Sequence, residues 1–224
     1  MREGNINAFL KDLGSDMGKS DSYSKSKMSV TACSVKRLLD VIASLVGLLV
    51  FSPVFLVIYW LIKLEDGGPV IFKQERIGYG GKPFTLYKFR SMTVRSEADG
   101  KPALCTKNDK RLTRVGSFLR SHHLDELPQL WNVLKGEMSF VGPRPERKFF
   151  IDKIMAINPD YELLYQLRPG LFSQATLYNG YTDTMEKMLE RLRMDLEYLH
   201  TRSLWLDIKI IYLTVYSIIS GKKF

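Results

Sequence analysis

Val41–Ile62 reads VIASLVGLLVFSPVFLVIYWLI and contains no charged side chain. A helix that crosses a bilayer needs roughly 20 apolar residues, so the length is sufficient for a crossing. Ser52 and Pro53 interrupt the run near its middle. Proline has no amide hydrogen, so we expect a kink here and a carbonyl at Leu49 that loses its helical donor. We expect the hydroxyl of Ser52 to help satisfy the freed group.

The residues that flank this run are basic on both sides. Lys36 and Arg37 precede it, and Lys63 and Lys73 follow it. A single crossing would export the basic N-terminal segment, against the tendency of positive charge to stay in the cytoplasm. The sequence therefore favours a re-entrant helix–break–helix over 36–66, after a polar extension over 1–35. A kinked single-pass anchor is the alternative.

The composition is basic. Lys and Arg number 33 against 24 Asp and Glu, which gives a net charge of +9. Such a balance favours a polyanionic partner, such as nucleic acid, an anionic bilayer or a phosphorylated substrate. The two cysteines and three histidines form no disulfide framework and no zinc-binding pattern.

Beyond the apolar run, the pattern predicts an α/β domain over 67–224 that is mainly helical. Val70–Ile77 and Phe84–Met92 alternate between apolar and polar residues around a glycine-rich turn, which predicts a β-hairpin. Lys88 and Arg90 share one face of its second strand. A polar loop is expected over 96–108.

Helical patterns dominate the rest of the chain. Short helices are expected after Asp109 and over Pro128–Lys135, a longer one over Lys148–Leu167 with a break near Asn158, and a charged amphipathic one over Thr184–His200. Leu204–Ile219 is strongly apolar but carries charged and aromatic residues. It fits an amphipathic helix at a membrane interface, and equally a core helix.

Asp125 and Glu126 stand where the helix that contains Pro128 is expected to begin. One carboxylate could attack phosphorus, and the other could hold Mg²⁺ together with substrate phosphates. The plainer reading makes Asp125 a helix cap and Glu126 a solvated first-turn acid.

Arginines are the second ingredient of this candidate site. Arg144 lies between two prolines that restrict its backbone, and a guanidinium held in this way suits phosphate recognition. Arg120, Lys88 and Arg90 could add further positive charge. Each could also be a surface cation, but phosphoryl transfer relies on such a set for positioning and charge neutralisation.

These motifs, taken in order, resemble one known family. The matching stretches are Lys36–Asp40, Ser52-Pro53, Phe72–Arg76, Lys88–Met92, Leu124–Gln129, Gly142–Pro145 and Arg168–Gly170. The chain resembles the small monotopic phosphoglycosyl transferases, a bacterial sugar transferase family, from about Lys36 to the C-terminus.

The resemblance implies the following roles. Ser52 and Pro53 would break the re-entrant helix, Asp125 would be the nucleophile of a covalent ping-pong mechanism, and Glu126 would be the Mg²⁺ ligand. Arg120 and Arg144 would contact phosphate. The donor would be a UDP-sugar, the acceptor polyprenyl (undecaprenyl) phosphate and the released product UMP.

The resemblance also implies a location, the cytoplasmic leaflet of the bacterial inner membrane, and a place at the first membrane step of glycan assembly. The segment Leu171–Leu177 departs from the family pattern, so the donor sugar stays open. Oligomeric state stays open as well, with a homodimer as one option. The rival readings are a non-catalytic, membrane-anchored basic scaffold and a nucleic-acid-binding protein, the latter lacking any recognisable motif.

Overall fold

The computed structural model describes residues 28–94, 109–179 and 184–220. The predicted loop over 96–108 and most of the predicted extension over 1–35 lie outside these ranges. The helices are α2 (Val30–Val50), α3 (Ser52–Asp66), α4 (Arg114–Ser121), α5 (Gln129–Lys135), α6 (Lys148–Met155), α7 (Gln174–Asn179), α8 (Met185–Thr201) and α9 (Leu204–Ile219). The strands are β1 (Ile71–Ile77), β2 (Pro83–Phe89), β3 (Ser139–Val141) and β4 (Gly170–Phe172).

The predicted mainly helical fold with a small β-hairpin is confirmed. Strands β1 and β2 pair antiparallel, and the connecting turn places Gly80 and Gly81 at positive φ, where glycine meets no Cβ penalty. A second sheet was not predicted. It is the parallel pair β3–β4, which is too short to show a hydrophobic period.

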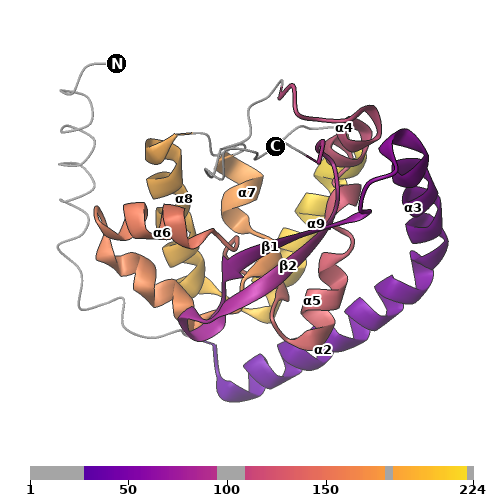
Figure 1. Cartoon of the computed structure of the whole chain (residues 1–224). Helices are drawn as coiled ribbons and strands as arrows, with labels where there is room; N and C mark the ends of the chain where they lie inside the picture. The colour runs from indigo at the N-terminus through magenta and orange to yellow at the C-terminus, as the bar shows by residue number, and fades with distance from the viewer. Residues whose placement is uncertain (1–27, 95–108, 180–183, 221–224) are drawn as a thin grey trace.

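Figure 1 shows how the elements are arranged. Helices α2 and α3 form an arc around one side of the domain, and the hairpin lies across the front. Helix α5 lies between the hairpin and this arc. Helices α6 and α8 stand on the opposite side. The largest core cluster joins α6, α8 and α9 through residues such as Ile154, Leu192 and Ile210.

The break between α2 and α3 follows the local chemistry expected of it. The two helix axes are bent by 58° at Phe51, and Pro53 lies in the first turn of α3. The Ser52 hydroxyl donates to the Leu49 carbonyl at 2.7 Å. The predicted kink and the predicted role of Ser52 in satisfying that carbonyl are therefore confirmed. Helix α2, however, begins at Val30, inside the segment assigned to the extension, because the Ser29 side chain caps it.

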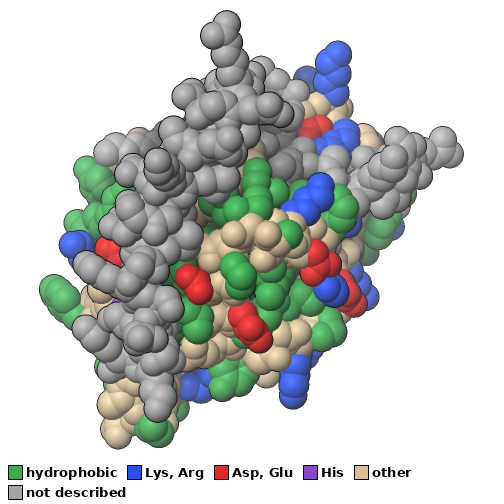
Figure 2. Space-filling model, turned by 90° about the vertical axis from the view of Figure 1, so that its left-hand side faces the viewer, with side chains coloured by type: hydrophobic (Ala, Val, Ile, Leu, Met, Phe, Trp, Pro, Cys, Tyr) green, Lys and Arg blue, Asp and Glu red, His purple; other side chains and the backbone are tan. Residues whose placement is uncertain are grey.

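Among the described residues, no single helix is long and apolar enough to span a membrane. The bent pair α2–α3, taken together, has the length and the apolar composition that a span needs. The pair leaves many large apolar side chains two-fifths or more exposed. These are Val30, Val35, Leu38, Leu39, Ile42, Leu45, Val46, Leu49, Val50, Phe51, Leu56, Val57, Tyr59, Trp60, Leu61 and Leu64. Figure 2 shows a different side of the molecule, the left-hand side of Figure 1, away from the arc of α2 and α3. On the described part of that face, acidic and basic side chains lie among the hydrophobic ones.

Helix α9 has one buried face and one exposed face. Asp207, Ile210 and Thr214 are buried, whereas Trp205, Tyr212 and Tyr216 are exposed. One face therefore packs on the domain, and the other presents aromatic rings outward. Helix α8 is mostly a core helix, since Leu189, Leu192 and Leu196 are buried.

Three charged side chains near the start of α2 tie this helix to the rest of the domain. Lys36 pairs with Asp207 of α9 at 2.6 Å. Arg37 donates to the carbonyls of Val133 and Leu134 at 2.7 and 3.0 Å, near the end of α5. Asp40 accepts from the backbone N–H of Phe140 at 3.1 Å. Helix α2 is thus bonded to α5, β3 and α9.

Candidate active site

Asp125 and Glu126 occupy a turn of their own. They belong to the 3-10 turn η3 (Leu124–Glu126), and α5 begins only at Gln129, with Pro128 as its N-cap residue. His123 lies between α4 and this turn and has a left-handed backbone conformation, at φ 55°. The expectation that the two carboxylates start the helix was therefore wrong, because Pro128 separates them from it. Neither acts as a side-chain cap of α5.

Glu126 lies at the centre of the charged groups. Nζ of Lys88 donates to its Oε1 at 2.6 Å, and Nη2 of Arg144 approaches the same oxygen at 3.4 Å. Burial by itself would raise the pKa of this carboxyl, but the charges of Lys88 and Arg144 outweigh it and leave the pKa below its usual value. Glu126 is therefore ionised at neutral pH.

Asp125 is more deeply buried, with 5% of its surface exposed. Burial raises its pKa, and the charge of Glu126 adds to that effect. Lys88 and Arg120 act in the opposite direction, toward the ionised form. Lys88 therefore acts on both carboxylates.

Arg144 is held by its neighbours in the chain and by a close approach of two backbones. A Cβ on Gly142 would come within 2.3 Å of the Arg168 carbonyl, and a Cβ on Gly170 within 2.1 Å of the Gly142 nitrogen. Only glycine allows this contact. The N–H of Gly170 also donates to the carbonyl of Pro143 at 2.8 Å, which fixes the loop that carries Arg144.

A buried charge network supports the same loop. Glu146 pairs with Arg191 of α8 and, at 3.3 Å, with Arg76 of β1, whose guanidinium also donates to the Pro145 carbonyl at 2.9 Å. None of these three residues has a role that was predicted from the sequence. Arg191 could have indicated this network in the sequence, because it is a charged residue among the apolar positions of the buried face of α8.

Arg90 lies in a different environment. Its guanidinium makes two hydrogen bonds to the carboxylate of Asp66 at the end of α3, one of them at 2.7 Å, and only 6% of the residue is exposed. The structure thus brings Lys88, Arg90, Arg120, Arg144 and the two carboxylates to the lining of one cavity, but the guanidinium of Arg90 is engaged by Asp66. This pairing does not favour the predicted phosphate-binding role of Arg90.

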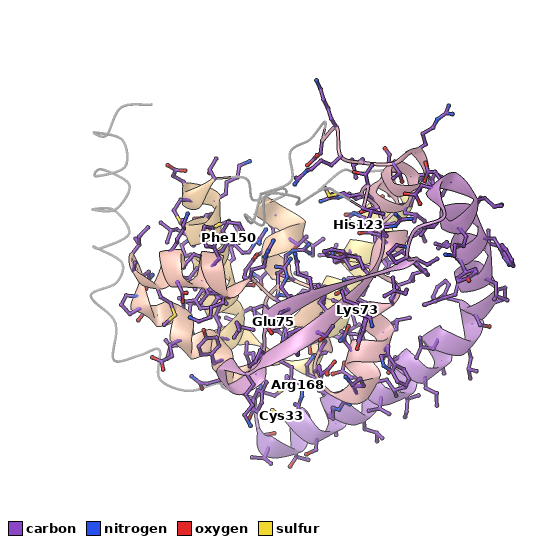
Figure 3. The ribbon with its side chains drawn as sticks, in the orientation of Figure 1. Cys33, Lys73, Glu75, His123, Phe150 and Arg168 are labelled. Carbon is purple, nitrogen blue, oxygen red and sulfur yellow. The ribbon has the colours of Figure 1, made fainter. Side chains whose placement is uncertain are left out.

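The site opens into one large cavity of about 1110 Å³. Asp125, Glu126, Lys88, Arg120 and Arg144 all line it. His123, Lys73 and Phe150 line it as well, and Figure 3 shows His123 and Lys73 well apart from Phe150, which comes from α6. The cavity therefore has room for more than a phosphate group.

Mg²⁺ is compatible with this donor set. Among the described residues, no cluster of three or more His, Cys, Asp or Glu side chains could enclose a metal. Mg²⁺ commonly binds through one or two carboxylates and is completed by substrate phosphates and water. The ionised Glu126, with Asp125 beside it at the cavity wall, is a donor set of that kind.

This fold and site define a mainly helical protein with a large cavity in which cationic side chains lie beside a carboxylate pair. The chain belongs to the bacterial sugar transferase family, whose model matches residues 31–221. The resemblance found in the sequence is confirmed, and it favours an enzyme over the scaffold and nucleic-acid-binding readings.

Curated relatives support the assignment. The chain is 49% identical over 183 residues to a UDP-glucose:undecaprenyl-phosphate glucose-1-phosphate transferase of Klebsiella pneumoniae, covering 81% of this chain and 39% of the relative. It is 41% identical to a UDP-N-acetylgalactosamine-undecaprenyl-phosphate N-acetylgalactosaminephosphotransferase of Aeromonas hydrophila, with 84% and 44% covered. A Caulobacter vibrioides transferase named for UDP-glucose is 44% identical, with 83% and 70% covered. The chain thus spans about two fifths of the length of the first two.

Proposed function

We propose that this protein transfers a sugar-1-phosphate from a UDP-sugar to polyprenyl phosphate, in most bacteria undecaprenyl phosphate, at the cytoplasmic face of the inner membrane. This reaction would be the first membrane step in the assembly of a surface glycan. The observation that carries the proposal is the gathering of Asp125, Glu126, Lys88 and Arg144 at one cavity. The relatives' names support the substrate classes, but they include two different sugars, so the proposal extends to the UDP-sugar class only.

The first step is an attack by a carboxylate oxygen of Asp125 on the phosphorus that carries the sugar. The bond from this phosphorus to the bridging oxygen of the diphosphate breaks, and UMP leaves with that oxygen. The sugar phosphate is then held on Asp125 as an acyl phosphate. Lys88 and Arg120 favour the ionised form of Asp125, which is the form that can attack.

In the second step, a phosphate oxygen of the polyprenyl phosphate attacks the same phosphorus. The bond to Asp125 breaks, the carboxylate is restored, and the product is a polyprenyl diphosphate sugar. Arg144 and Lys88 would bind and orient the phosphate oxygens in both steps. Mg²⁺, held by Glu126, would supply neutralising charge for the diphosphate.

The bent pair α2–α3 would be the membrane-inserted segment. It would enter the bilayer from the cytoplasmic side and return to the same side. Its exposed apolar surface and the basic residues Lys36, Arg37 and Lys63 on both flanks support this topology. Tags at each terminus, probed in intact cells, should both react only from the cytoplasm. A tag at the N-terminus that reacts from the periplasm would replace the re-entrant topology with a single crossing.

The covalent mechanism is tested with Asp125→Asn. Purified protein is incubated with a UDP-sugar labelled in the sugar phosphate, then denatured and weighed by mass spectrometry. We expect a sugar-phosphate adduct and UMP release for the wild type, and neither for Asp125→Asn. Asp152→Asn, at an exposed carboxylate of α6, is the matched control. Near-normal turnover in Asp125→Asn would exclude the mechanism.

A further inference from the structure

We propose that the isoprenoid chain of the acceptor lies between α2 and α9, in an apolar arm of the active-site cavity. The inference rests on the proposed function and adds a location for the part of the substrate that does not react. It concerns cavity walls that lie apart from Asp125 and Glu126 in the sequence.

One wall of this arm is a stripe along α2. Leu39, Ala43 and Gly47 line the cavity, and their spacing of four residues places them on one face of the helix. Phe51, the residue after the helix, lines the cavity as well. The small side chains at Ala43 and Gly47 leave this wall shallow. Leu130 of α5 lines the cavity too, and a Cβ on Gly47 would meet its side chain at 3.1 Å.

The second wall is a stripe along α9. Ile211, Thr214, Val215 and Ile218 line the same cavity and lie on one helical face. The hydroxyl of Thr214 donates to the carbonyl of Ile210 at 2.8 Å, so its hydrogen is already used within the helix. This wall offers apolar groups to an occupant.

The α2 wall has one charged member, Asp40, whose Oδ1 accepts from the Phe140 N–H. Because both partners of this hydrogen bond belong to the protein, an apolar occupant would not need to break it. Burial of apolar surface is favourable when polar groups at the contact keep their partners.

The residues that line the cavity differ in charge in the way an amphiphile requires. The cations Lys88, Arg120 and Arg144 gather around the carboxylates, whereas the named residues of the α2 and α9 walls are uncharged apart from Asp40. A phosphate joined to a long hydrocarbon chain matches this division. A UDP-sugar has no hydrocarbon chain, so the arm would distinguish acceptor from donor although both bring a phosphate to Asp125.

The arm can be filled by substitution. Ala43→Phe and Val215→Phe add a ring at the two walls, and Leu45→Phe is the control. Leu45 is also exposed on α2 but points about 200° away from Ala43. We expect both wall variants to raise the KM for undecaprenyl phosphate by about tenfold or more. The KM for a short, water-soluble isoprenyl phosphate and the donor-only release of UMP should change little. An unchanged KM for the long acceptor in both wall variants would overturn the inference.

A binding measurement separates this inference from the proposed function. A photoreactive polyprenyl phosphate is added to the wild type and to Asp125→Asn in detergent, and the labelled residues are located by mass spectrometry. We expect label on the α2 and α9 walls, reduced in Ala43→Phe. Label confined to the outer face, around Leu45 and Trp60, would overturn the inference even if the enzyme turns over. Label on the walls without any UMP release in the wild type would overturn the proposed function but would still support a lipid-binding site between α2 and α9.

Discussion

Lys88 of the hairpin and Glu126 of η3 are joined by an ion pair of 2.6 Å across 38 residues of sequence. This contact couples the β-hairpin to the turn that carries both carboxylates. Arg144 approaches the same oxygen from the loop after β3. Three separate segments thus meet at Oε1 of Glu126.

Lys88→Met should shift the pH dependence of the enzyme. Lys88 is the largest charge that lowers the pKa of Glu126, and without it the raising effect of burial gains weight. If Glu126 binds Mg²⁺ as a carboxylate, as proposed above, activity at low pH should be lost first. The acid limb of kcat/KM against pH should therefore move to higher pH, whereas Lys82→Met, at the exposed hairpin turn, should leave it in place. An unmoved acid limb would argue against a metal role for Glu126.

Glu126→Gln should weaken the response to Mg²⁺. The amide keeps the size of the side chain but removes the charge that a divalent cation needs. We expect a drop in kcat of about 100-fold or more and a higher Mg²⁺ concentration for half-maximal rate. Titration of UMP release with Mg²⁺ measures both quantities. Glu190→Gln, on the exposed face of α8, is the control, and an unaltered Mg²⁺ titration in Glu126→Gln would contradict the assignment.

Arg90→Met should affect stability rather than substrate binding. Arg90 pairs with Asp66, whose side chain is 29% exposed, so the loss should be about 1–3 kcal/mol in the free energy of unfolding. Denaturant unfolding measures this loss, with the exposed Arg114→Met as the matched control. The KM for the donor should stay within about twofold of the wild type. A large rise in that KM with unchanged stability would restore Arg90 as a phosphate ligand.

Asp195→Asn should remove a pH dependence of stability. Burial raises the pKa of Asp195 from 3.8 to about 7, against the charge of Arg191 and the hydrogen bond from Ser173. Between these two pH values the folded protein binds more protons than the unfolded chain, so the free energy of unfolding falls as pH rises through the window. The fall is at most on the order of 4 kcal/mol. Unfolding of both proteins at pH 5 and pH 8 should show a smaller fall for Asp195→Asn, and equal falls would contradict the pKa.

Local chemistry was sufficient to predict several features. The kink at Pro53, the hydrogen bond of Ser52 and the end of α5 at Gly136 depend on neighbours within a few residues. The hairpin also followed from its alternation and its glycine turn. Motif order supplied the family and the roles expected of Asp125 and Glu126.

Features that depend on distant partners were not predictable from the sequence. The pairing of Arg90 with Asp66 and that of Glu146 with Arg191 join residues 24 and 45 positions apart. Neither spacing has a period that a sequence pattern reveals. Strands β3 and β4 have three residues each, too few to alternate visibly, and their pairing is set by the contact between Gly142 and Gly170.

The bonds from Lys36, Arg37 and Asp40 to the domain have a practical consequence for anyone who wishes to prepare this protein. A fragment that starts at residue 67 would lack all three, and it would leave Asp207 and the last carbonyls of α5 without these donors. Truncation should therefore yield misfolded material rather than a water-soluble enzyme. Purification should keep helices α2 and α3 and, under the proposed membrane topology, supply a detergent or nanodisc in place of the lipid.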